Sequence, residues 1–456
     1  MPSFIIIPSF FILSILTLTL PKPRAGFLRV KRRMLYAPDK SISDACFPFS
    51  YYHIVTGVNI PEPCGAKVNF IKRYKRIKLF SRNSQYYYRV FERGRVAVPR
   101  RRREAPQRAA DKGFRTVKTK DKQVKQGDIG VYRQFINFSG YSFDLEKFNS
   151  DWGEFRKFLA ANNLDGAEML LDFAALDDSV PKDLVAAVHF PSFMGWYRLW
   201  TDKDFTVPTA IDKSIVKYFY GGEDTAELIS NFRSCIADNA KFAPAYGVFH
   251  AGYMEAEHTF MKKMPVADSA VLDATAELLN EVAGTFAGGE MPYPIAIENL
   301  WWAGLTFLTP SDTSRFADRL EFENWFFLLD TGHLMNAGGA VFSEEEGIGF
   351  VLDTLRRLSA DTLEKIRAVH FHFSASGEYQ RRMKAPDNFD AMPFEEQSAA
   401  IMAHLGKFDQ HRPFTLPDCK KILDFVKPDY VTHEFMGTRD ELEAAVNRQL
   451  RALNGS

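Results

Sequence analysis

Cysteines are few in this sequence, and they are scattered. Only four occur in 456 residues, and none forms a CxxC pair: Cys46, Cys64, Cys235 and Cys419. This pattern excludes a disulfide framework and a thiolate zinc site, because both need regularly spaced cysteines. We expect free thiols in a cytoplasmic protein, where cysteines stay reduced.

Acidic residues are scarce in the first 128 positions. This segment has 28 of the 58 Lys and Arg residues but only 8 of the 57 Asp and Glu residues, which leaves 30 basic and 49 acidic residues in the rest of the chain. An acidic body lacks the broad positive surface that binds phosphate backbones non-specifically. We therefore expect a small-molecule substrate and no nucleic-acid partner.

A long apolar run occurs only at the start, over residues 3–20. About 18 residues are the lower limit for a membrane span. Basic residues follow the run from Lys22 onward, so an N-terminal anchor would leave the rest of the chain on the cytoplasmic side. A cleaved secretory peptide fits less well, because no basic residues precede the run. Membrane association therefore depends on this stretch alone.

Residues 22–125 contain an arginine run at 99–104 and three tyrosines at 86–88, without a sustained helical or strand period. Two interpretations stay open: sequence translated upstream of the true start codon, or a disordered basic tail or membrane anchor. Either places a domain boundary near residue 128. We expect a basic segment of low order over 1–128 and one folded domain over 129–456.

From residue 130, short apolar runs alternate with amphipathic helical patterns, which is typical of parallel βα units. A Gly-rich phosphate turn, which usually opens a doubly wound sheet, is missing. Eight such strands predict a (β/α)8 TIM barrel with modest insertions. The expected strands are 135–139, 167–173, 184–190, 246–252, 293–300, 325–332, 366–373 and 430–435.

Ionisable residues recur where these strands end, which is where TIM barrels hold their active sites. A charged residue in a buried strand is costly unless it is paired or binds a cation. Imidazole and carboxylate suit zinc, manganese and related divalent ions. The strand ends carry His189, His250, Glu298, Asp330, His333, His370, His372, His433 and Glu434.

Several positions stay ambiguous. His370 and His372 are two apart, so both can face the barrel interior, whereas only one of the neighbours His433 and Glu434 can. Two further histidines, in helical or loop segments, are expected at the surface, and four tryptophans near the third and fifth strands are interpreted as core packing, with ligand stacking as the alternative. These residues are His258, His404, Trp196, Trp200, Trp301 and Trp302.

Five segments, in order, resemble the xylose isomerase-like TIM-barrel superfamily, which includes endonuclease IV and sugar isomerases and epimerases. The resemblance covers about 130–450, and its DxxH pair, Asp330 and His333, is characteristic. The segments are IAIENLWW, LLDTGHLMNA, VHFHFSASGEY, FDQH and VTHEF.

The resemblance implies two ligand sets. An isomerase or epimerase would hold one metal with Glu298, Asp330, His370 and Glu434. A phosphoester-cleaving relative would hold three metals with nine ligands. These are His189, His250 and Glu298 for the first; Glu298, Asp330, His370 and Glu434 for the second; and His333, Asp409 and His411 for the third.

The DxH pair Asp409 and His411 favours the phosphoester-cleaving set, because a plain isomerase has no use for it. Gly304 stands where epimerases tend to place an acid, six residues after Glu298. The loop after His411 lacks the glycines of an endonuclease IV, so abasic DNA is the less favoured substrate. The resemblance suggests instead a small phosphodiester such as the nucleotide loop of a cobamide, with the aromatic segments 190–200 and 300–307 lining a wide mouth.

The sequence therefore predicts a hydrolase of a small-molecule phosphoester that uses up to three divalent ions, zinc or manganese. The candidate catalytic residues are Glu298, which would orient the attacking water, with Glu434 and His333. A sugar isomerase or epimerase, in which Glu298 and Glu434 shuttle a proton, is the alternative. A non-catalytic binding barrel is the third hypothesis.

Overall fold

The computed structural model describes residues 69–70, 76–81, 84–89, 132–171, 175–207 and 213–455. The apolar stretch 3–20 and most of the basic segment lie outside these residues. Within that segment, three short strands form an antiparallel sheet in the order β1-β2-β3, in a region where the sequence showed no sustained period: β1 (Asn69–Phe70), β2 (Arg76–Ser81) and β3 (Ser84–Arg89). No helix among the described residues is long and apolar enough to cross a membrane.

Eight parallel strands close into a barrel, which confirms the predicted fold class and all eight predicted strands. Each strand pairs with its sequence neighbour, and the last pairs with the first through Tyr430 and Arg133. The strands are β4 (Arg133–Ser139), β5 (Gly166–Leu170), β6 (Val185–His189), β7 (Gly247–His250), β9 (Ile295–Glu298), β11 (Trp325–Asp330), β12 (Ile366–His370) and β13 (Tyr430–His433).

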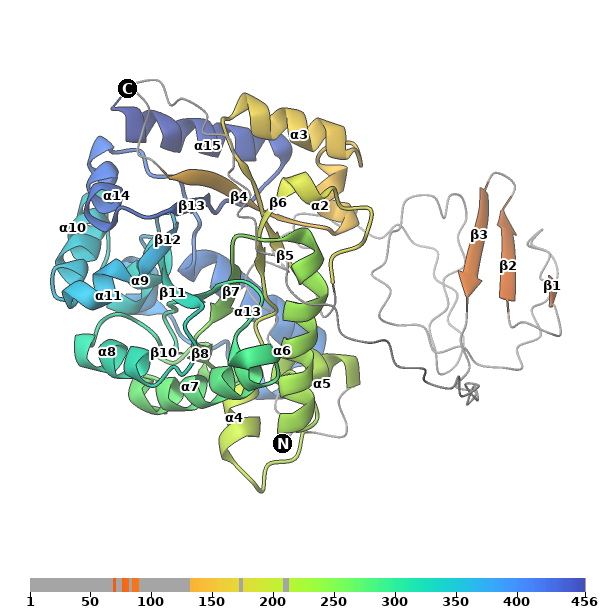
Figure 1. Ribbon diagram of the computed structural model, residues 1–456, viewed down its shortest axis with the longest axis horizontal. Helices are drawn as coiled ribbons and strands as arrows, with labels where there is room; N and C mark the ends of the chain where they lie inside the picture. The colour runs from red at the N-terminus through yellow and green to blue at the C-terminus, as the bar shows by residue number, and fades with distance from the viewer. Residues whose placement is uncertain are drawn as a thin grey trace, which may run out of the picture. The chain divides into compact units, whose positions relative to one another are not determined.

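Helices surround the barrel (Figure 1). The first four are α2 (Ser142–Glu146), α3 (Trp152–Ala161), α4 (Trp196–Thr201) and α5 (Lys213–Tyr220). The next five are α6 (Thr225–Asn239), α7 (Asp268–Gly284), α8 (Pro310–Asp318), α9 (Thr331–Gly338) and α10 (Glu344–Leu355). The last five are α11 (Ala360–Glu364), α12 (Gly377–Arg382), α13 (Phe394–Phe408), α14 (Lys420–Val426) and α15 (Arg439–Asn454).

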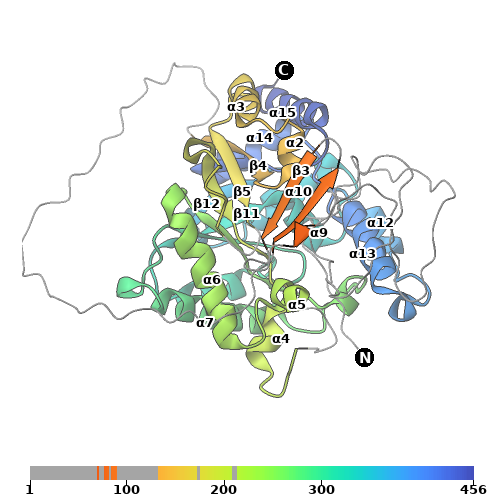
Figure 2. The same cartoon turned by 90° about the vertical axis from the view of Figure 1, so that its right-hand side faces the viewer.

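The closure of the barrel brings the first and last helices together. Helices α3 and α15 lie side by side in both views (Figures 1 and 2), and Arg439 of α15 reaches Glu154 of α3 at 3.6 Å. Helices α2 and α3 do not form one continuous helix, because Asn149 and Ser150 between them both have a φ of 56°. That left-handed conformation cannot continue an α-helix.

Side chains alternate between the two faces of each strand, as the strand period of two requires. Outward residues such as Ile297 and Leu329 pack against the helices. Inward residues such as Phe135, Val248 and Phe326 form a separate apolar cluster that fills the barrel. The interior is therefore a solid base, and the ionisable residues lie beyond it at the C-terminal ends of the strands.

A small antiparallel pair, β8 (Gly252–Tyr253) and β10 (Ala303–Gly304), lies just after β7 and β9. Gly304 has a φ of 138°, and a Cβ there would collide with the carbonyl oxygen of Ala251. The position where epimerases tend to place an acid therefore has no room for a side chain.

Candidate metal centre

Three neighbouring strands supply the first set of ligand atoms, which we call the strand group: His189, His250 and Glu298. The pairing of β7 with β9 sets His250 beside Glu298. The Nε2 atoms of His250 and His189 lie 2.9 and 3.4 Å from Glu298 Oε2. Their Nδ1 atoms lie 2.8 Å from Ser192 Oγ and 3.1 Å from the Phe190 carbonyl. These outer contacts orient both Nε2 atoms toward one point, as is usual around metal-binding histidines.

The DxxH pair has a local structural reason. Asp330 is the N-cap of α9, and its Oδ1 accepts a hydrogen bond from the backbone N–H of His333 at 2.6 Å. An N-cap carboxylate that bonds to the third helical residue places the two side chains within one turn. Asp330 Oδ2 remains free to face His372 Nε2, at 3.0 Å. Gly332 permits this approach, because a Cβ there would collide with the His372 ring.

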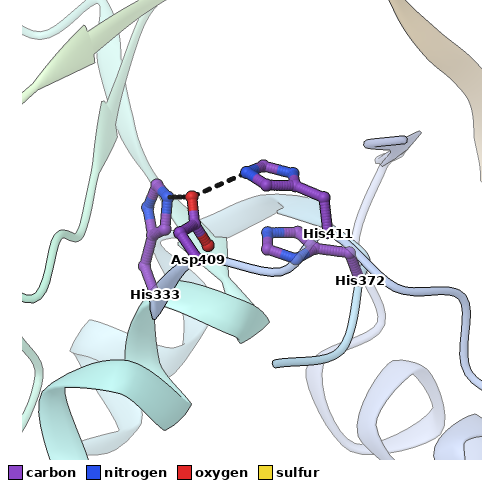
Figure 3. Close-up of side chains that lie close together, drawn as sticks. All are labelled: His333, His372, Asp409 and His411. Atoms are coloured by element: carbon purple, nitrogen blue, oxygen red, sulfur yellow. Dashed lines mark hydrogen bonds and ion pairs between the residues drawn. The ribbon is translucent and has the colours of Figure 1, made fainter. Parts of the chain in front are cut away.

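Four residues from α9, the end of β12 and the segment after α13 form what we call the loop group: His333, His372, Asp409 and His411 (Figure 3). Asp409 Oδ2 lies 2.6 Å from His411 Nε2 and 3.4 Å from His333 Nε2. The His372 and His411 rings stack with centroids 4.1 Å apart. His411 has a φ of 45°, an uncommon conformation for a residue with a side chain.

A third set of side chains surrounds His370. Its Nδ1 lies 3.0 Å from Glu434 Oε1, 3.3 Å from Glu298 Oε1 and 3.6 Å from Asp330 Oδ2. Each of the three carboxylates comes from a different strand end. The structure therefore brings together the four residues that the resemblance implied for the second metal.

Glu168 was missed by the sequence analysis. It lies on β5, and its carboxylate is 3.0 Å from His370 Nε2, whereas the other three carboxylates face Nδ1 of the same ring. Tyr246 Oη and Thr432 Oγ1 donate hydrogen bonds to Glu168 Oε2 at 2.8 and 3.2 Å. The residue precedes the end of its strand by two positions, so a search of strand ends passes over it. Its charge within the apolar run AEMLL was the available signal.

The structure decides between the ambiguous neighbours on the last strands. His370 and His372 both reach the centre, and Glu434 faces it. His433 points the other way, with Nδ1 2.7 Å from Gln449 Nε2 and Nε2 3.1 Å from Gln134 Oε1. Burial lowers the pKa of His433 to about 4.

Two surface predictions were wrong. His258 and His404 are both buried. The Nδ1 of His258 accepts a hydrogen bond from the Glu255 backbone N–H at 3.0 Å, and the Nδ1 of His404 lies 2.8 Å from Tyr379 Oη. Both rings are amphipathic enough to sit in the interior once a polar partner is present.

The tryptophans divide between core and centre. Trp196 is buried and donates a hydrogen bond to the Gly252 carbonyl, which confirms that it packs in the core. The segment 190–200, which we expected to line a wide mouth, is largely buried in the core. Trp200 is partly exposed, with Nε1 3.4 Å from Glu277. Trp302 is buried, but Trp301 is half-buried and meets the His333 ring edge-on at 4.7 Å.

Burial by itself would raise the pKa of each carboxyl in the centre. For Glu298 the nearby His250 and His370 outweigh burial and hold the pKa of the carboxyl well below its usual range. The pKa of Glu434 is raised well above its usual range by burial, and Asp330 and Glu298 add to this. The same burial thus has opposite outcomes for the two glutamates, because histidines dominate around Glu298 and carboxylates add to burial around Glu434.

The histidines respond to the same balance. Burial would lower the pKa of His333, but Asp330 and Asp409 outweigh it and raise that pKa well above 6.5. For His372 burial wins, and its pKa is lowered. Nearby carboxylates raise the pKa of both rings and burial lowers it, and the balance differs between the two.

The side chains fit a cluster of divalent ions. Within the described ranges, no Lys or Arg forms an ion pair with any of the centre's carboxylates, and the ion-pair contacts of Glu298 and of Glu434 are all with histidines. Buried charges need a partner, and a divalent cation with nitrogen and oxygen ligands supplies one. The carboxylates are Glu168, Glu298, Asp330, Asp409 and Glu434, each no more than 2% exposed.

No family model and no curated protein matches the sequence. Solved structures with a similar arrangement include endonuclease IV from Thermus thermophilus, at 14% identity over 71% of this chain and 100% of that one, with a TM-score of 0.41. D-allulose 3-epimerase from Methylomonas sp. matches at 14% identity over 72% and 99% of the two chains, with a TM-score of 0.37. The IOLI protein with a bound zinc atom matches at 12% identity over 70% and 96%, with a TM-score of 0.36.

The chain has the fold that the resemblance to the xylose isomerase-like superfamily implied, because its own strand pairing closes an eight-stranded parallel barrel.

Proposed function

We propose that this protein is a divalent-metal-dependent hydrolase that cleaves a phosphoester of a small molecule. The loop group is the observation that carries the proposal. A one-metal isomerase needs only the set around His370, yet Asp409 and His411 are buried beside His333 and extend the centre well past that set. Three adjoining ligand sets suit the displacement at a phosphorus atom, in which attacking, leaving and non-bridging oxygens all carry charge.

Three sets of residues would each hold one ion. The strand group would hold one ion, and the loop group another. Between them, Glu298, Asp330, His370 and Glu434 would hold the third, with Glu298 shared with the strand group. When bound, divalent ions supply Lewis acidity, which favours ionisation of water and offsets charge on phosphoryl oxygens.

The protein's own residues then position the reactants. Glu298 would orient the attacking water and accept its proton, because its two oxygens face opposite parts of the centre, one toward His250 and the other toward His333. Glu168 would hold the His370 ring through Nε2, so that Nδ1 keeps facing the three carboxylates. Glu434 and His333 would border the phosphoryl group from the two sides of His370.

A small cavity of about 40 Å³ adjoins the centre, and Glu168, His189 and Glu434 line it. Lys147 is in the same lining, where it pairs with Asp144 at 2.7 Å. A lysine at this position suits an anionic substrate. Within this class, the nucleotide-loop phosphodiester of a cobamide stays our candidate, as the resemblance implies.

A sugar isomerase or epimerase is the second candidate, and the set around His370 favours it. One ion held by Glu298, Asp330, His370 and Glu434 would serve such a reaction, with two carboxylates available to move a proton. Gly304 weighs against the epimerase, because no acid can be built at that position.

The test combines metal analysis with an assay on bis(p-nitrophenyl) phosphate, using the full-length protein. The hydrolase predicts about three ions per chain and the isomerase about one. The double variant Asp409→Ala with His411→Ala should lose one ion and at least about 100-fold of the phosphodiesterase activity, more than an outer-partner substitution costs.

The matched control is Asp353→Ala, which removes an exposed aspartate paired with Arg356 and should change neither quantity. If the double variant kept full activity, the loop group would have no part in catalysis and the hydrolase proposal would fail. A chain that binds no divalent ion would exclude both candidates.

A further inference from the structure

A pocket of about 470 Å³ opens on the His333 side of the centre. Its walls include Trp301, Trp302 and Phe408, and Lys262 and Arg381 stand among its lining residues. No Asp or Glu occurs among the described residues that line it. The proposed reaction at the metal centre uses none of these five side chains, so the pocket needs its own explanation.

The pocket shares a wall with the loop group. The centroid of the Trp301 ring lies 4.7 Å from that of His333, which it meets edge-on, and 5.5 Å from that of Phe408, on which it stacks. Asn336 also lines the pocket, and its Nδ2 donates to Asp409 Oδ1 at 3.2 Å. A molecule in the pocket would therefore contact Trp301 and Asn336, which in turn contact the candidate ligands His333 and Asp409.

Exposed apolar side chains gather at this pocket. Among the described residues, three large hydrophobic side chains are markedly exposed: Met261 at 41%, Phe342 at 40% and Phe425 at 40%. Two of these, Met261 and Phe342, line the pocket. Exposed apolar surface in a concave site is typical of ligand binding, and flexible methionines adapt to a ligand's outline.

The rim of the pocket is basic. Lys262 Nζ donates to the Arg381 carbonyl at 2.9 Å, and within the described residues Lys262 forms no ion pair. The Arg381 guanidinium lies 4.5 Å from the centroid of the Phe342 ring, while one of its nitrogens is 3.6 Å from Glu378. The two cationic residues are thus held together at the edge of an aromatic surface, which favours a ligand that combines a ring with negative charge.

We propose that this pocket binds the flat ring system of an aromatic phosphate, stacked on Trp301, with the phosphoester directed toward His333 and Asp409. Lys262 and Arg381 attract the anion to the rim. The inference rests on the proposed function in one respect: it makes the bound molecule the substrate of the hydrolase. The contact of the phosphoester with the loop group also needs bound metal, because the Asp409 carboxylate by itself repels an anion. Stacking on Trp301 and attraction at the rim need neither metal nor turnover.

The test measures binding to full-length protein that a chelator has freed of metal, by titration calorimetry. The probe is 1-naphthyl phosphate, and its two halves are represented by 1-naphthol and glycerol 2-phosphate. We expect 1-naphthyl phosphate to bind more tightly than either. Trp301→Ala should weaken its binding about tenfold, the usual effect of losing an aromatic stacking partner.

The rim is tested by Lys262→Glu with Arg381→Glu. Both side chains are exposed, so the variant should fold. It should weaken the binding of 1-naphthyl phosphate about tenfold and leave 1-naphthol unchanged, because only the anion senses the charge. Phe425→Ala, an equally exposed apolar position outside the pocket, should change neither affinity.

The proposal is overturned if Trp301→Ala binds 1-naphthyl phosphate as wild type does, or if glycerol 2-phosphate binds as tightly. If the alanine variant does not fold, Trp301→Leu replaces it, since leucine keeps apolar bulk but not the ring. Failure here and failure of the proposed function are distinguishable. Binding without phosphoester cleavage in the metal-loaded protein would refute only the hydrolase, and cleavage without binding of the probe by the metal-free protein would refute only the pocket.

Discussion

The strand group and the loop group are built by different means. His189, His250 and Glu298 sit at the ends of hydrogen-bonded strands, so the barrel itself sets their spacing. His333 and Asp409 lie outside the strands and are held by side-chain hydrogen bonds: His333 by the Asp330 cap within one helical turn, and Asp409 by Asn336, 73 residues earlier in the chain. A ladder of many bonds holds the first set, whereas single contacts hold the second. The loop group should therefore be the easier of the two to lose.

The largest effect tests whether the two groups are joined. Glu298 lies 2.9 Å from His250 in the strand group and 3.1 Å from His333 in the loop group. Glu298→Gln removes the negative charge shared by both, so both should lose metal. We expect an activity loss well beyond the roughly 10- to 100-fold typical of an outer partner. Metal content and phosphodiesterase rate measure this.

The matched control is Glu255→Gln, which changes a glutamate that is 2% exposed and lies outside the centre. It should leave the metal content unaltered. If Glu298→Gln lost metal from one group only, the strand group and the loop group would be independent metal sites.

The second test breaks the loop group alone. Gly332→Ala places a methyl group against the His372 ring, which stacks on His411. Forcing a methyl group into a packed site typically costs about 1–3 kcal/mol. We expect a lower Tm and loss of the metal at the loop group, with the strand group still loaded.

Gly349→Ala is the control for that substitution, because a Cβ there would meet no atom within 4 Å. It should keep the wild-type Tm or raise it slightly, since alanine favours a helix. Equal Tm and metal content in the two alanine variants would show that His372 has room to move, contrary to the tight packing described here.

The smallest effect concerns acid sensitivity on the loop side. His404 lies on α13, the helix that leads to Asp409, and burial together with Lys407 lowers its pKa from 6.5 to about 4. The unfolded chain binds the proton first, so this residue costs stability as the pH falls from 6.5 toward 4. One pH unit corresponds to about 1 kcal/mol.

The free energy of unfolding, measured at pH 6.5 and 5.5, checks this. Between pH 6.5 and 5.5, the free energy of unfolding should fall by about 1 kcal/mol less in His404→Gln than in wild type. An unchanged pH dependence in the variant would mean that His404 is protonated in the folded protein, and its contact with Tyr379 would then need a different account.

The sequence was most informative where one residue's neighbours along the chain determine its place. The DxxH pair is a capped helix start, so its geometry is local and was predictable. The residues at strand ends were predictable because a parallel barrel gathers all of them at one rim. Glu168 was not, because its role depends on the His370 ring, 202 residues away. The burial of His404 depends likewise on Tyr379 and on packing by Phe260 and Phe408.

The sequence by itself determined the eight-stranded barrel and most of the ionisable residues at its rim, because strand period and local hydrogen bonding follow from nearby residues. Only the tertiary structure decided that Glu434 and not His433 faces the centre, that His372 stacks on His411, and that Trp301 joins a basic-rimmed pocket to the loop group. These outcomes depend on which distant side chains meet in three dimensions, and spacing along the chain carries no record of that.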